Sequence, residues 1–111
     1  QVTQQNGVTV LCTGPKYTGL ENQALDELAN TLLAEIARSS PPRIVIDMTR
    51  TEYIASSFIE LMIRAWKRVK HDSGTMALCA VHSYCQEVLR VSHLDTVWPI
   101  YATRDEAIRA V

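Results

Sequence analysis

Two adjacent hydroxyl side chains, Ser56 and Ser57, lie between a short apolar run and an amphipathic helical pattern. Glu60 follows Ser57 by three residues, which is the spacing of a capping box. In that arrangement the serine oxygen and the glutamate carboxylate each accept a hydrogen bond from a backbone N–H at the helix start. Serine is also among the residues preferred at helix N-termini. One interpretation is therefore structural, with both serines acting as caps and turn formers.

The same two hydroxyls also suit a phosphorylation switch. A helix N-terminus offers unpaired N–H groups and the positive end of the helix dipole. A phosphoryl group there would add about −1.5 to −2 charges. On a docking surface this charge would repel an acidic patch of a partner and add a desolvation cost, so binding would be controlled without a change of fold. Spacing alone leaves both interpretations open.

Other residues that could perform chemistry are isolated in the sequence. His71, His82 and His93 lack a second ligand at metal-binding spacing, so surface or turn positions are expected for them. Asp47 ends an apolar run but has no glycine-rich phosphate loop or nucleophile motif beside it, which favours a structural hydrogen-bonding role over catalysis. We therefore predict no metal site, no cofactor and no catalytic residue.

The three cysteines, Cys12, Cys79 and Cys85, are odd in number and lack CxxC spacing, so they do not indicate a disulfide framework. We expect them to pack as small apolar side chains in a reducing compartment. Cys85 lies near the start of a short helix, where a lowered pKa is the functional alternative to packing.

Bulk composition narrows the class of protein further. The 111 residues fit a single domain over 1–111, and the net charge of −1 argues against a general nucleic-acid binder. No apolar run approaches the roughly 20 residues of a membrane span, and no signal peptide is visible. We expect a cytoplasmic domain.

Strand and helix patterns alternate along the chain. The expected strands are 7–12, 43–48, 75–81 and 97–101, and the expected helices are 20–37, 58–70, 83–91 and 103–111. Residues 49–57 should form a loop with some extended character. Pro99 implies an edge strand or a bulge, and Thr103 with Glu106 matches a capping box. This order predicts an α/β sheet with right-handed crossovers.

The helix expected at 58–70 carries two distinct sides. Its apolar stripe comprises Ile59, Met62, Ile63, Trp66 and Val69, and its basic side comprises Arg64, Lys67, Arg68 and Lys70. A basic helix side is usually a solvated face, and the functional alternative is a docking surface for an acidic partner.

The stretch RIVIDMTRTEYIASSFIELMIRAWKRVK, followed by GTMALCAV and VWPIYATRDEAIRAV, resembles the STAS domain. This family includes the anti-sigma factor antagonists and the stressosome proteins. The order of elements matches over nearly the whole chain with no large insertion. The resemblance implies a STAS fold: a mixed, mostly parallel sheet of four or five strands with helices packed mainly on one side.

The resemblance also assigns the serine turn. The family pattern of Asp, phosphorylated Ser, a second hydroxyl and Gly falls on Ala55, Ser56, Ser57 and Phe58. Ala55 departs from this pattern, because the carboxylate expected to position the serine for a kinase is absent. Phe58 replaces the usual glycine, as it does in some stressosome-type members.

The implied function is a protein-interaction module that binds an anti-sigma factor of the serine-kinase type, with phosphorylation at Ser56 or Ser57 weakening the complex. The expected partner-binding residues are Ala55, Ser56, Ser57, Phe58, Glu60 and Arg64. A non-phosphorylated STAS scaffold or stressosome-like adaptor is one alternative, and a small-ligand sensor or an enzyme is another. The oligomeric state stays open, with a homo-oligomer among the alternatives.

Overall fold

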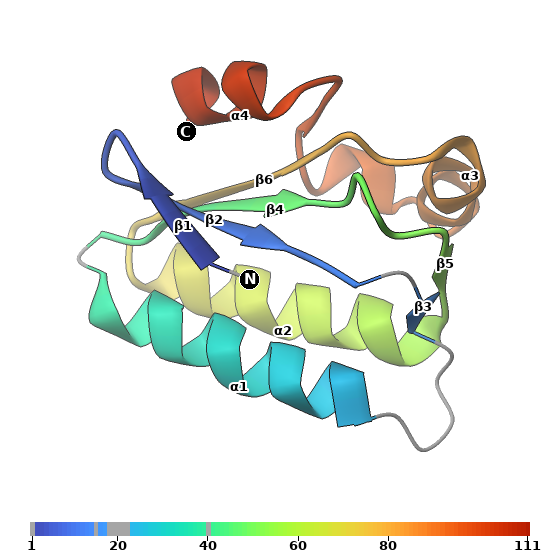
Figure 1. The fold of residues 1–111 in the computed structure, drawn as a ribbon, viewed down its shortest axis with the longest axis horizontal. Helices are drawn as coiled ribbons and strands as arrows, with labels where there is room; N and C mark the ends of the chain where they lie inside the picture. The colour runs from blue at the N-terminus through green and yellow to red at the C-terminus, as the bar shows by residue number, and fades with distance from the viewer. Residues whose placement is uncertain (1, 15, 18–22, 40) are drawn as a thin grey trace.

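The computed structural model describes residues 2–14, 16–17, 23–39 and 41–111, and a five-stranded mixed sheet forms its centre (Figure 1). In spatial order the strands are β1 (Val2–Gln5), β2 (Val8–Cys12), β4 (Arg43–Asp47), β6 (Thr75–Cys79) and β7 (Ile100–Tyr101). Strand β1 is antiparallel to β2, and every other neighbouring pair in this sheet is parallel. The expected mixed, mostly parallel sheet is therefore confirmed.

Strand β1 was not predicted. It joins β2 through a two-residue turn in which Asn6 and Gly7 have φ of 53° and 79°. Positive φ at both central residues is what a type I′ hairpin turn requires, and Asn-Gly is its strongest sequence signal. The polar Gln4 and Gln5 concealed the strand pattern before this turn, so the expected strand at 7–12 captures only the second half of the hairpin.

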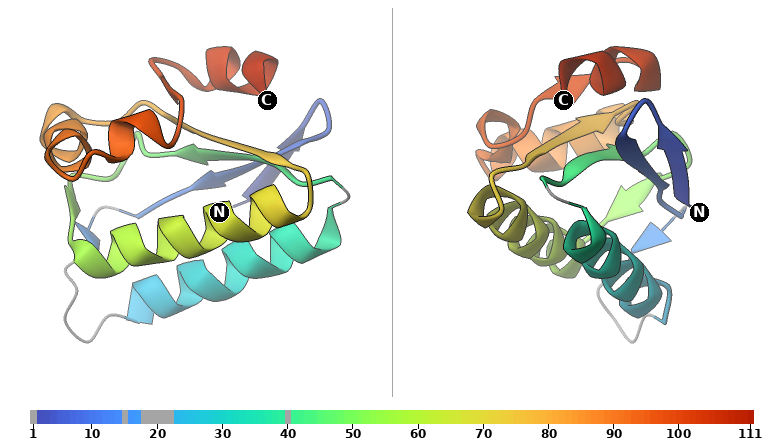
Figure 2. Two further views of the ribbon diagram at one scale, coloured as in Figure 1. Left: turned by 180° about the vertical axis from the view of Figure 1, so that it is seen from behind. Right: turned by 90° about the vertical axis from the view of Figure 1, so that its left-hand side faces the viewer.

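Helices cover both faces of the sheet unequally. They are α1 (Gln23–Arg38), α2 (Ser56–His71), α3 (Ser83–Val91) and α4 (Arg104–Ala110), and a short 3-10 helix, η1 (Leu94–Thr96), follows α3. Figures 1 and 2 show α1 and α2 side by side on one face and α4 alone on the opposite face. Among the described residues, no helix is both long enough and apolar enough to cross a bilayer.

The position of β4 at the centre of the sheet explains why its sequence is almost continuously apolar. Ile44 and Ile46 point into the main core beneath α1 and α2, whereas Val45 belongs to a second cluster together with Ala107 and Ile108 of α4. Successive strand residues face opposite sides of a sheet, so a strand covered on both faces needs apolar side chains at every position.

The carboxyl ends of the parallel strands meet at one end of the molecule. Cys12 pairs with Asp47 and Asp47 with Cys79, so the last residues of β2, β4 and β6 are in register. A two-stranded parallel sheet, formed by β3 (Lys16–Tyr17) and β5 (Tyr53–Ile54), follows at the same end. The start of α2 and the whole of α3 also lie there (Figure 1), which brings the serine turn to this edge.

Replacing Gly74 by alanine is expected to destabilise the fold. A Cβ at this position would lie 2.2 Å from the carbonyl oxygen of Pro42, which itself accepts the N–H of Thr75 at 2.9 Å. The backbone must shift to relieve the overlap, so Gly74→Ala should lower the free energy of unfolding by about 1–3 kcal/mol. Urea denaturation measures this, and Ser92→Ala at an exposed position is the control, with an expected change within about 0.5 kcal/mol. Equal stability of Gly74→Ala and the wild type would contradict the argument.

Candidate functional site

Helix α2 begins earlier than its sequence predicted. Its first residue is Ser56, and Ala55 occupies the N-cap position with an extended backbone (φ −117°, ψ 178°). The carbonyl of Ala55 accepts the N–H of Phe58 at 3.0 Å and that of Ile59 at 3.3 Å. Because Ser57 already has helical geometry, the expected capping box between Ser57 and Glu60 is wrong. An alanine offers no side-chain oxygen to the first N–H groups of the helix.

The two serines differ in their access to solvent. Ser56 is exposed, whereas the Ser57 hydroxyl oxygen is buried and has no hydrogen-bond partner among the described residues. Adjacent helical residues point about 100° apart, which follows from 3.6 residues per turn, so one serine faces outward while the next faces inward. A kinase cannot reach a buried oxygen, so the expectation of Ser57 as a phosphate acceptor is corrected and Ser56 is kept.

The other residues expected at the partner surface divide in the same way. Phe58 is 1% exposed and lies in the main core, so its side chain cannot contact a partner, and this expectation is wrong. It replaces a glycine of the family pattern, and the added ring is accommodated by packing inward.

The other three residues expected at the partner surface are accessible: Glu60 and Arg64 are exposed and Ala55 is half-buried. Glu60 and Arg64 flank a shallow groove of about 320 Å³ between α1 and α2, whose lining also includes Ser57.

Asp47 anchors the loop that leads to this turn. Its Oδ1 accepts hydrogen bonds from the Thr49 backbone N–H at 2.9 Å and from the Thr49 hydroxyl at 2.5 Å. Its Oδ2 accepts from Arg104 Nε at 2.8 Å, and Arg104 Nη2 lies 2.9 Å from the Cys12 sulfur. The structural role expected for Asp47 is therefore confirmed. Its partner Arg104 was not identified, because no sequence signal links residues 57 positions apart.

The charge of Asp47 is well stabilised. Burial raises the pKa of this carboxyl, but the hydrogen bonds from Thr49 and the charge of Arg104 outweigh burial and hold the pKa below its usual value. The carboxylate is therefore ionised at neutral pH and binds Arg104 as an ion pair, with the Asp47 side chain 7% exposed. Such a pair suits a structural anchor, since a catalytic acid needs a pKa nearer neutrality.

Further contacts hold the segment between Asp47 and Ser56. The Thr51 hydroxyl donates to the Gly14 carbonyl at 2.7 Å and forms a short hydrogen bond with the Thr13 hydroxyl. His82 Nε2 lies 2.6 Å from the Thr49 carbonyl oxygen. The loop is thus bound to residues that follow β2 and to the residue that precedes α3. These contacts give Ser56 a defined position at the surface.

The other candidate residues are the histidines and the cysteines. The described residues contain no group of three or more side chains that could hold a metal ion. Burial raises the pKa of the Cys79 thiol to about 12 and also raises the pKa of Cys85. The alternative of a low-pKa thiol at Cys85 is therefore wrong, and both side chains are buried packing residues, as expected.

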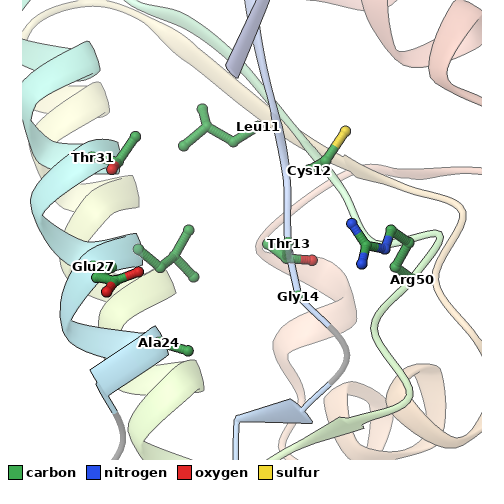
Figure 3. A pocket seen from close by; sticks show the side chains of 9 residues that line it. Leu11, Cys12, Thr13, Gly14, Ala24, Glu27, Thr31 and Arg50 are labelled. Carbon is green, nitrogen blue, oxygen red and sulfur yellow. The ribbon is translucent and has the colours of Figure 1, made fainter. Parts of the chain in front are cut away.

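A pocket of about 270 Å³ lies where β2 ends (Figure 3). Its charged lining residues are Glu27 on α1 and Arg50 in the loop after β4, and Thr13 and Thr31 also line it. Glu27, Arg50 and Thr31 are exposed, so the pocket opens to solvent and does not enclose a set of convergent polar groups. This lining favours neither a specific small ligand nor a catalytic site.

Comparison with known proteins places this geometry in a family. The profile of the STAS domain matches residues 1–107. BtrV of Bordetella bronchiseptica, which bears the provisional name of anti-sigma factor antagonist, is 25% identical over 105 residues, covering 95% of this chain and 87% of BtrV. A STAS domain protein from Planctomyces limnophilus, described as an anti-sigma-factor antagonist, is 40% identical with a TM-score of 0.85, over 99% of this chain and 95% of that protein.

A more distant solved structure has the same fold. The phosphorylated form of SpoIIAA, a cell fate determinant of Bacillus, has a TM-score of 0.75 at 18% identity, over 99% of this chain and 96% of that one. At this level of identity the likeness concerns the fold alone. The expected STAS fold, with its mixed and mostly parallel sheet, is confirmed by both solved structures.

Breaking the Asp47–Arg104 ion pair should destabilise the protein. In Arg104→Met the carboxylate stays buried without its cation. We expect the free energy of unfolding, measured by urea denaturation at pH 7, to fall by about 1–3 kcal/mol, less than for a fully buried pair because Arg104 is 31% exposed.

The folded pKa of Asp47 lies below its unfolded value, so its contribution to stability is complete above about pH 4 and is lost as the pH falls through the folded pKa. Urea denaturation of wild type and Asp47→Asn between pH 2 and pH 7 (roughly the range over which carboxyl groups titrate) should show a flatter profile for the variant. Parallel profiles would contradict this.

A side-chain cap at position 55 should stabilise the helix. Ala55→Asp supplies an oxygen for the first N–H groups of α2 and a negative charge at the positive end of the helix dipole, with an expected gain of about 0.5–2 kcal/mol. Ala55→Asn is the matched control, because it caps without a charge. The gain from Asp should decrease in acid, whereas the gain from Asn should not. Urea denaturation at pH 7 measures the free energy of unfolding of both variants. If neither variant is more stable than the wild type, Ala55 does not act as an N-cap.

Proposed function

The chain belongs to the STAS domain family, and from this premise we propose that it acts as an anti-sigma factor antagonist. It binds an anti-sigma factor of the serine-kinase type and so releases a sigma factor. Its action is binding and not catalysis. The single observation that carries the proposal is the exposed hydroxyl of Ser56 at the first residue of α2, on a loop that is fixed from several elements.

Phosphorylation of Ser56 is proposed to weaken the complex. The phosphoryl group would add about −1.5 to −2 charges at a surface the partner must cover, and the covered charge would lose hydration. The position permits this modification without a change of fold, because the Ser56 side chain points into solvent. Bacillus SpoIIAA, which has the same fold, has been solved in a phosphorylated form, and this supports the proposal by likeness alone.

The charge of α2 favours an acidic partner surface. The helix carries four basic side chains, Arg64, Lys67, Arg68 and Lys70, and all four are exposed. Its one acidic residue is Glu60, and the whole chain has a net charge of −1. Cations are therefore concentrated on the helix that begins at Ser56. Complementary charge steers association, and a phosphate at the start of this helix would oppose it.

A second candidate function is a scaffold or stressosome-like adaptor that uses the same surface without phosphorylation. Ala55 favours it, because the carboxylate that the family pattern places beside the serine is missing. The buried Phe58 agrees with the stressosome-type variant of that pattern. Size-exclusion chromatography with light scattering separates the two functions, since a scaffold would form large assemblies alone.

The proposal is tested by incubating the protein with each serine-kinase-type anti-sigma factor encoded in the same genome and Mg-ATP, followed by intact mass spectrometry. We expect the gain of one phosphoryl group, its loss in Ser56→Ala and its retention in Ser57→Ala, because the Ser57 oxygen is buried. A mass increase that survives Ser56→Ala would exclude Ser56 as the target.

Binding to the same anti-sigma factors is measured in parallel by isothermal titration calorimetry. Ser56→Glu should weaken the complex at least about tenfold, which corresponds to about 1.4 kcal/mol. Gln5→Glu is the control, because it adds an equal charge at an exposed position near the opposite end of β2. Equal binding by Ser56→Glu and the wild type would mean that the partner does not cover this turn.

A further inference from the structure

Three large apolar side chains of the described residues are exposed, and they belong to one region. Tyr53 is 38% exposed, Tyr84 is 51% exposed and Val91 is 65% exposed. The rings of Tyr53 and Tyr84 stack with centroids 5.7 Å apart and planes inclined by 17°. A cluster of exposed apolar side chains, unlike single scattered ones, can mark an interaction site.

The geometry of α3 joins Val91 to the tyrosine pair. Tyr84 and Val91 are seven residues apart, which is about two helical turns, so they lie on the same side of α3. Val88, four residues after Tyr84, lies between them on that side and is half-buried. Tyr53 from β5 extends this line at the start of the helix. The result is a continuous apolar strip of Tyr53, Tyr84, Val88 and Val91, named here the α3 strip.

The size of the α3 strip indicates what kind of contact it makes. With roughly 200 Å² for a whole tyrosine side chain, the exposed parts sum to on the order of 300 Å². A stable interface buries about 800 Å² on each partner, so the strip alone is too small to hold two copies of this chain together. It fits as the apolar part of a larger contact surface.

The adjoining surface is the serine turn. Tyr53 precedes Ser56 by three residues, so their Cα atoms are at most about 11 Å apart. A partner that buries about 800 Å² around Ser56 covers a patch of roughly 16 Å radius, which reaches Tyr53. Tyr84 adjoins this patch because its ring stacks on that of Tyr53. Figure 1 shows the start of α2, β5 and α3 at the same end of the molecule.

We propose that the α3 strip is the apolar contact for the same anti-sigma factor that covers Ser56, and that it receives exposed apolar side chains of that partner. This inference rests on the proposed function. Tyrosine is enriched among the residues that dominate interface energies, and its hydroxyl can stay hydrated at the rim of the contact.

The strip also supplies a reason for phosphate sensitivity. Ser56 lies at the edge of an apolar contact that must exclude water to form. A phosphoryl group at that edge retains its hydration shell and keeps the apolar surfaces apart, in addition to repelling acidic groups of the partner. Phosphorylation of Ser56 alone would then weaken the whole interface, although the phosphoryl group contacts only a small part of it.

The test measures the Kd of each variant for the serine-kinase-type anti-sigma factor of the same genome that the wild type binds. Tyr84→Ser and Val91→Ser should each weaken binding at least about fivefold to tenfold, with a smaller negative heat-capacity change because less apolar surface is buried. Tyr84→Phe is the matched control: it keeps the ring and should bind within about twofold of the wild type. Unchanged thermal midpoints, expected for exposed positions, establish that the variants fold.

The outcomes separate this inference from the proposed function. If Ser56→Glu weakens binding but Tyr84→Ser and Val91→Ser bind like the wild type, only the strip is excluded. If no serine-kinase-type anti-sigma factor binds the wild type, both proposals fail. If light scattering finds a wild-type dimer that Tyr84→Ser dissociates, the strip contacts a second copy of this chain and the inference is overturned.

Discussion

The carboxylate of Asp47 joins parts of the chain that are distant in sequence. It receives hydrogen bonds from Thr49 in the following loop and an ion pair from Arg104 at the start of α4. Arg104 in turn reaches the Cys12 sulfur at the end of β2. One side chain at the end of the central strand therefore fixes where the loop begins and where the helix on the opposite face of the sheet docks.

From this anchor the chain continues to the serine turn with little freedom. Thr49 and Thr51 are tied to His82, Gly14 and Thr13 before the chain enters α2. Helix geometry then decides which hydroxyl is displayed. Ser56 points to solvent and the Ser57 oxygen points inward, because consecutive helical residues differ by about 100° in direction. A protein partner that recognises this surface would need a fixed loop and a single exposed hydroxyl.

Under the proposed function, the surroundings of Ser56 offer two kinds of surface to a partner. Basic side chains follow it along α2, and Tyr53, three residues before it, belongs to the α3 strip. Charge can steer the encounter and apolar area can hold the complex, so both contributions are sensitive to a phosphate placed where they meet. Ala55 is compatible with this arrangement, since it changes the capping of α2 and not the exposure of Ser56.

Local patterns in the sequence were sufficient for most elements of this fold. The apolar run of β4 predicted a strand buried on both faces, and the helix at 83–91 was predicted with the bounds it has. The expected apolar stripe of α2 is correct for Met62 and Val69, which are buried, and wrong for its other three members. Ile59, Ile63 and Trp66 are only partly buried, while Leu61 and Ala65 are buried, because apolar residues occupy more than half of the helix circumference and the sequence cannot show which part faces the sheet.

The sequence by itself determined the order of the helices and of the longer strands, without β1 and β3, and the placement of a serine turn between a central strand and an amphipathic helix. Both follow from short-range periodicity. The tertiary structure decided which serine is exposed, that Phe58 is buried, that Asp47 pairs with Arg104 and that Tyr53 stacks on Tyr84. Each of these depends on contacts between residues brought together by sheet register and helix docking. Such contacts leave no periodic trace in a single chain, because residues far apart in sequence meet only once the elements have packed.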